Sequence, residues 1–167
     1  MNPSHTLKEA KSKIEYYCAY QERCHKEVTE KLRSMGMIPA AIDQILVGLI
    51  TDNFLNEMRF AQSYARGKFR IKKWGKNRIK QELKVRDISS YCIKAGLKEI
   101  DPQEYLEIFH EISFKKGTSL ENLSLLKQRK KLADYLLYRG WESHLVYDKL
   151  QELPFQETAK PAKSWVL

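Results

Sequence analysis

The most constraining feature of this sequence is a pattern of aliphatic residues that recurs three times along the chain. Placing Leu32, Leu83 and Leu136 in register, at spacings of 51 and 53 residues, aligns three further aliphatic columns. These columns are Val28, Ile79 and Leu132, then Ile42, Ile93 and Val146, then Leu46, Leu97 and Leu150. A period of roughly fifty residues is typical of a helical repeat protein, in which each unit buries its apolar face against its neighbours.

Within each period the apolar residues recur every three or four positions, which predicts helices rather than strands. In the first unit Gly36 stands where a left-handed residue ends a helix, and Pro39 suits the first turn of the next one. We therefore predict an all-α fold of three tandem three-helix repeats that form an elongated, curved helical array. The predicted repeats cover residues 1–52, 53–99 and 100–153, and we expect residues 154–167 to form a disordered tail.

Capping signals place several helix starts. Asn56 precedes a predicted helix as an N-cap residue, because its side chain can accept a hydrogen bond from a free backbone N–H. Asp101, Pro102 and Glu104 predict another start, with Glu104 reaching back to the cap. The pattern predicts the following helix over residues 120–139.

The positive charge of the chain is concentrated in one segment. The chain has 30 Lys and Arg against 21 Asp and Glu, a net charge of +9. Residues 66–80 contain eight basic and no acidic residues, namely Arg66, Lys68, Arg70, Lys72, Lys73, Lys76, Arg78 and Lys80. A local charge of this kind favours a polyanion or an acidic protein surface as partner, and a solvated helix face is the alternative.

Two features of this region add candidate contacts. Trp74 lies among the cations, where it has either a core role or a role in stacking on a base. Arg59 and Arg66 lie two helical turns apart and therefore share a face of one predicted helix. That face either binds a carboxylate or phosphate through the guanidinium groups or is an ordinary solvated face.

The sequence contains no motif typical of catalysis or cofactor binding. Cys18, Cys24 and His25 lack a second pair of ligands at zinc spacing, and no glycine-rich phosphate loop is present. Three cysteines argue against a disulfide framework, and no apolar run is long enough to cross a bilayer. We expect a cytoplasmic, monomeric protein that is not an enzyme, holds no metal or cofactor and does not bind membranes.

Two segments carry a resemblance to a known family. The first segment comprises Leu55–Ala61, Tyr64 and residues 66–68. The second segment comprises Trp74, Gly75, Arg78, Ile79, Glu82 and Leu83. These residues resemble the signature of the RecX family of recombinase regulators. Family members often have Gly where this chain has Asp87, and Asp tolerates a left-handed turn at some cost.

The resemblance implies a regulator of recombination and DNA repair, linked to the SOS response. Such a protein binds the groove of the RecA filament and inhibits its ATPase and strand exchange. The candidate residues for contact with the filament or DNA are Arg59, Arg66, Lys68, Arg70, Lys72, Lys73, Lys76 and Arg78, together with Gly75. The candidate structural residues are Phe60, Ile79, Leu83, Leu32 and Leu136.

Two other functions are compatible with the same residues. One is a sequence-independent nucleic-acid-binding helical-repeat protein, with single- or double-stranded DNA as its partner. The other is a helical adaptor for an acidic protein, in which charge speeds association.

Overall fold

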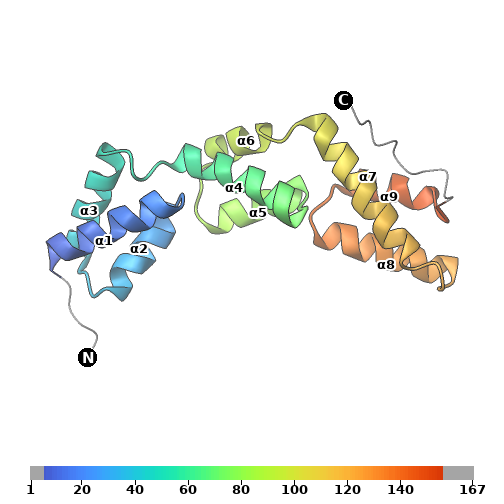
Figure 1. Cartoon of the computed structure of the whole chain (residues 1–167), viewed down its shortest axis with the longest axis horizontal. Helices are drawn as coiled ribbons and strands as arrows, with labels where there is room; N and C mark the ends of the chain where they lie inside the picture. Colours follow the sequence, from blue (N-terminus) through green and yellow to red (C-terminus); the bar gives the residue numbers. More distant parts are fainter. Residues whose placement is uncertain (1–5, 156–167) are drawn as a thin grey trace, which may run out of the picture. The chain divides into compact units, whose positions relative to one another are not determined.

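The computed structural model describes residues 6–155, and within this range the chain folds into nine α-helices and no strand, which confirms the all-α prediction (Figure 1). The helices are α1 (Leu7–Tyr20), α2 (His25–Ser34), α3 (Pro39–Thr51), α4 (Glu57–Lys72), α5 (Lys76–Val85), α6 (Ser90–Lys98), α7 (Pro102–Thr118), α8 (Leu125–Tyr138) and α9 (Ser143–Gln151). None of these helices is long and apolar enough to cross a membrane.

The described residues form two compact units. The first contains residues 6–66 and 80–99, and the second contains residues 67–79 and 100–155. The division falls within α4 and α5, so each of these helices contributes residues to both units.

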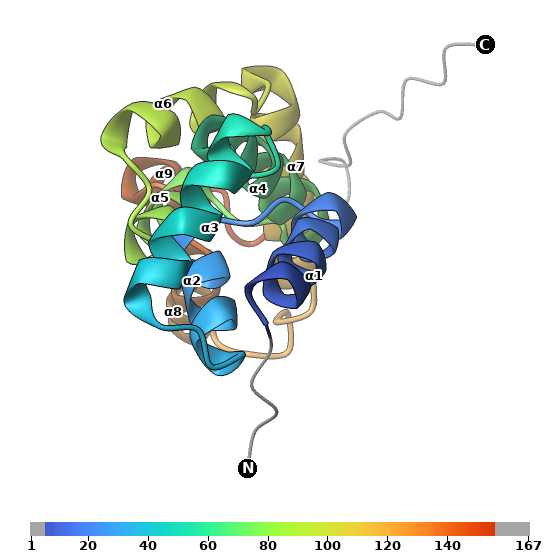
Figure 2. The same cartoon turned by 90° about the vertical axis from the view of Figure 1, so that its left-hand side faces the viewer.

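In the first unit, α1, α2 and α3 pack on one another (Figure 2). Their shared core includes Ile14, Val28, Leu32 and Leu49, each fully buried. The N-terminus of α4 is capped as expected, since the backbone N–H of Arg59 donates to Asn56 Oδ1 at 2.9 Å.

In the second unit, α8 packs against α7 and α9 around an aromatic core. Trp141 is 1% exposed, and its ring centroid lies 4.4 Å from that of Tyr105 and 5.1 Å from that of Phe109. Phe69 of α4 joins the cluster through Tyr105, with ring centroids 5.6 Å apart. Aromatic rings at these separations attract one another beyond the area they bury.

One turn recurs three times with the period seen in the sequence. Gly36, Asp87 and Gly140 each lie four residues after a leucine of the first column and have φ angles of 79°, 58° and 84°. The N–H of the next residue donates to the carbonyl of that leucine, at 3.2 Å in the first turn, 3.1 Å in the second and 3.2 Å in the third. This is a Schellman C-cap, which satisfies helix-end carbonyl groups. The three repeat boundaries and the elongated, curved outline stay predictions.

Two local predictions differ from the structure. Helix α8 begins at Leu125 rather than at residue 120, because Gln128 Nε2 donates to the carbonyls of Glu121 and Leu123 and holds a turn there. Asp101 does cap α7, but the Glu104 carboxylate binds Arg70 instead of reaching back to the cap.

The predicted disordered tail, 154–167, is described only at its start. Phe155 packs against Phe114 with ring centroids 5.8 Å apart, and residues 156–167 lie outside the described part of the chain.

Candidate binding surface

The basic segment, residues 66–80, comprises the end of α4, a short turn and the start of α5. Arg70 and Lys72 lie in the last turn of α4, where cations interact favourably with the helix dipole. Lys73 then takes a left-handed conformation, with φ 55°, and the Trp74 N–H donates to the Lys68 carbonyl at 3.3 Å. The chain thus ends α4 and starts α5 while keeping the basic residues close together.

The arginines of α4 are bound to carboxylates of the same unit. Arg59 pairs with Glu22, and Arg66 pairs with Glu99 at 2.6 Å, both in the first unit. In the second unit, Arg70 donates to both carboxylate oxygens of Glu104 at 3.2 Å. The face shared by Arg59 and Arg66 therefore does bind carboxylates, but they belong to this chain, and each pair offsets the arginine's charge.

Several lysines of the segment, together with Arg78, carry charge that no carboxylate of the described residues offsets. Lys72 and Lys80 are exposed and Lys73 is half-buried, and none of them makes an ion pair with another residue of the described range. Lys76 is half-buried, with its ammonium 4.6 Å from the centroid of the Tyr105 ring. An anionic partner would meet these lysines without first displacing a carboxylate.

Trp74 is neither a fully buried core residue nor a fully exposed stacking residue. It is half-buried, and two cations lie over its ring, Arg78 at 4.2 Å and Lys68 at 5.3 Å from the centroid. Arg78 also lies 4.7 Å over Tyr138, and its Nη1 donates to the Tyr138 carbonyl at 3.1 Å. Tyr138 is 75% exposed and was not among the sequence candidates, although its place just before Arg139 and Gly140 was a usable signal.

Gly75 does not form part of the surface. It is buried against Gly140, and a Cβ atom there would lie 2.3 Å from the Gly140 carbonyl oxygen. Gly75 thus packs inside the second unit, and the role in a contact with a partner that the resemblance implied stays a prediction.

The candidate structural residues are buried. Phe60 is 4% exposed, and the remaining four, Ile79, Leu83, Leu32 and Leu136, are completely inaccessible.

A second basic group went unnoticed in the sequence. Lys127, Lys130 and Lys131 are exposed on α8, and they form no ion pair with residues 6–155. Their spacing puts them on one face of the helix. The run of basic residues at 127–131 was a usable signal, which the stronger charge at 66–80 obscured.

The cysteines are buried rather than reactive. Burial raises the pKa of the Cys18 thiol to about 11, and burial is also the main cause that raises the pKa values of Cys24 and Cys92. A protonated thiol is a poor nucleophile and a poor metal ligand. Residues 6–155 contain no group of three side chains placed to hold a metal ion.

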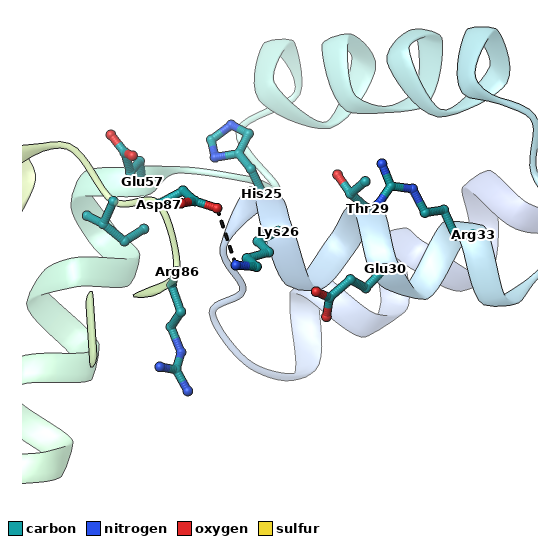
Figure 3. A pocket seen from close by; sticks show the side chains of 9 residues that line it. His25, Lys26, Thr29, Glu30, Arg33, Glu57, Arg86 and Asp87 are labelled. Carbon is teal, nitrogen blue, oxygen red and sulfur yellow. Dashed lines mark ion pairs between the residues drawn. The ribbon is translucent and has the colours of Figure 1, made fainter. Parts of the chain in front are cut away.

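An open pocket of about 450 Å³ lies in the first unit (Figure 3). Its lining mixes basic and acidic side chains, namely His25, Lys26, Arg33 and Arg86 with Glu30, Glu57 and Asp87. Lys26 Nζ lies 3.4 Å from Asp87 Oδ2 and donates to the Val85 carbonyl at 2.8 Å, which joins α2 to the turn after α5. The mixed charge favours no single class of ligand.

Comparisons with known proteins point to one family. A family model described as "RecX, second three-helix domain" matches residues 56–97. The curated relatives include the regulatory protein RecX of Bacillus cytotoxicus, 27% identical over 137 residues, and that of Bacillus cereus, 26% identical over 137 residues. Each match covers 82% of this chain and 51% of the relative, so the chain spans about half the length of the curated relatives it matches.

Solved structures share the fold. A crystal structure of RecX from Lactobacillus salivarius aligns with a TM-score of 0.75 at 24% identity and covers 88% of this chain and 96% of that one. A second crystal structure, of regulatory protein RecX, aligns with a TM-score of 0.77 at 22% identity and covers 87% of this chain and 73% of that one. At such identities the likeness shows the fold, which is that of a helical repeat array.

Proposed function

The chain belongs to the RecX family, and from this premise we propose that it regulates a RecA-type recombinase as a non-catalytic binding protein. In this proposal the protein acts as a monomer in the cytoplasm. It binds in the groove of the recombinase filament and inhibits ATP hydrolysis and strand exchange.

Binding alone suffices for such inhibition. A ligand that prefers one state of a filament shifts the population toward that state by its difference in affinity for the two states. A repeat protein that contacts successive protomers and prefers a filament geometry unsuited to hydrolysis lowers the ATPase rate without performing chemistry. The regulator needs only a surface that recognises the filament.

The observation that carries the proposal is that some cations of the basic segment are paired with carboxylates and others are not. Arg66 and Arg70 are bound to Glu99 and Glu104, whereas Lys72 and Lys73 have no carboxylate partner in the described range. Unpaired charge is what an anionic surface of the filament attracts, since a paired arginine must first give up its carboxylate.

The test measures binding of the fluorescently labelled chain to recombinase filaments assembled on DNA. Replacing Lys72 and Lys73 with Gln should weaken binding roughly tenfold, or ~1.4 kcal/mol. The matched control replaces Lys94 and Lys98, two exposed lysines of α6, and should leave the affinity unchanged. If both variants lost the same affinity, the effect would come from net charge alone. That result would contradict a site on the basic segment.

A sequence-independent nucleic-acid binder is the second candidate, and the aromatic rings among the cations of the second unit favour it. It predicts tight binding to bare DNA, with an affinity that falls steeply with salt. Weak binding to DNA at roughly 150 mM salt would exclude it as the main function.

A further inference from the structure

Tyr138 is a large aromatic side chain that is mostly exposed at the end of a helix. It is the last residue of α8, and it is 75% exposed although Gly140 and Trp141, just after it, are buried. Most of its ring therefore faces solvent at a point where the backbone is fixed by the turn at Gly140.

Arg78 holds Tyr138 in place from α5. The guanidinium donates to the Tyr138 carbonyl at 3.1 Å and lies 4.7 Å from the centroid of the ring. The same guanidinium lies 4.2 Å from the centroid of Trp74. One arginine thus contacts two aromatic rings, and it forms no ion pair with a carboxylate of the described residues.

Further positive charge surrounds the rings. Arg139 follows Tyr138 directly, donates to the Lys72 carbonyl at 2.6 Å and lies 4.7 Å over the Tyr135 ring. Lys72 is exposed at the end of α4. Asp134, an acidic residue one turn before Tyr138, shares this face of α8.

An exposed ring among unpaired cations is the combination that proteins use for single-stranded nucleic acids. Cations attract the phosphates, and each base that stacks on an aromatic side chain adds to the affinity. An acidic protein surface or an intact duplex would use the same cations but would present no unpaired base to the ring.

We propose that Tyr138, held by Arg78 beside Trp74, is a stacking site for an unpaired base of single-stranded nucleic acid. The proposal deepens the second candidate function and does not depend on a recombinase. Trp74 and Arg78 position the platform, and Lys72 and Arg139 bind the neighbouring phosphates.

The experiment measures binding of the full chain to a short oligothymidylate and to an abasic oligonucleotide of equal length, by fluorescence anisotropy without recombinase. The wild-type chain should bind the oligothymidylate about tenfold more tightly, which corresponds to ~1.4 kcal/mol for one stacked base. Tyr138→Leu should remove this difference, and Tyr138→Phe should keep it because the ring is retained.

Tyr91→Leu provides the matched control, because Tyr91 is 74% exposed on α6 in the first unit. It should bind both oligonucleotides as the wild type does. The slope of log affinity against log salt should be equal in the wild type and in Tyr138→Leu, since the phosphate contacts remain.

Two results would overturn the proposal. Equal affinity of the wild-type chain for the two oligonucleotides would exclude base stacking while leaving nucleic-acid binding intact. Absence of binding to both would overturn the second candidate function together with the stacking site.

Discussion

Gly75 and Gly140 lie in direct contact, so that a methyl group on Gly75 would be 2.3 Å from the Gly140 carbonyl oxygen. Around this contact the Gly75 N–H donates to the Arg139 carbonyl at 2.9 Å, and the Asn77 N–H donates to the Gly140 carbonyl at 3.1 Å. The Lys76 N–H donates to the Tyr105 hydroxyl at 2.9 Å. The first N–H groups of a helix lack acceptors in the helix itself, and here residues distant in sequence supply them.

Gly75→Ala should therefore destabilise the chain by about 1–3 kcal/mol, the usual cost of forcing extra atoms into a packed site. The control is Gly67→Ala in α4, where an added Cβ would meet no atom within 4 Å. That change should stabilise the chain by up to about 1 kcal/mol, because Ala favours a helix more than Gly does. Urea unfolding of both variants measures the effects, and equal stability of Gly75→Ala and wild type would contradict the contact.

Asp87→Gly should raise the stability by roughly 0.5–1 kcal/mol. Asp87 has a φ of 58°, which Gly adopts without the steric cost that a side chain brings. The ion pair with Lys26 that the change removes is exposed and contributes little. Thermal unfolding should show a higher Tm for Asp87→Gly and a lower Tm for Asp87→Ala. A lower Tm for the Gly variant would mean that the ion pair outweighs the backbone strain.

Glu57 should contribute stability that is lost in acid. Burial alone would raise its pKa, but hydrogen bonds from the Ser89 N–H at 3.1 Å and the Ser89 hydroxyl at 2.9 Å outweigh burial and lower it below 4.5. A lowered pKa in the folded state means that this contribution is present above pH 4.5 and disappears as the pH falls through the folded pKa.

The free energy of unfolding, measured against pH, should thus fall less steeply below pH 4.5 in Glu57→Gln than in the wild type. Ser89→Ala should also make this fall less steep, because it removes one of the donors to the Glu57 carboxylate. Parallel curves for wild type and Glu57→Gln would show that the carboxylate is not held as described.

The three thiols should react slowly in the folded chain. Cys18, Cys24 and Cys92 are at most 7% exposed, and their pKa values are raised. At pH 8 a thiol reagent should label them much more slowly than in the urea-unfolded chain, since the thiolate is the reactive form. Rapid labelling of one thiol before unfolding would show local opening at that helix.

Local signals predicted much of the fold, and contacts between distant residues explain what they missed. Gly36, Pro39, Asn56 and Asp101 mark helix ends through the chemistry of a few neighbours, and those ends are confirmed. The same local signals predicted that Glu104 reaches back to the helix cap, yet its carboxylate binds Arg70, which lies 34 residues away.

The candidate surface was harder to predict for the same reason. The sequence located the basic residues at 66–80 but gave no sign that Arg66 and Arg70 are paired while Lys72 is not. Gly75 was a candidate through the resemblance alone, and the sequence gave no sign that Gly140, distant along the chain, packs against it.

The most direct test of the central claim is a titration of the chain into the DNA-dependent ATPase reaction of its cognate recombinase. Substoichiometric inhibition is predicted for the wild type, with a clear loss of inhibition when Lys72 and Lys73 are replaced by Gln. An ATPase rate that stays constant up to a saturating concentration of the wild-type chain would contradict the account.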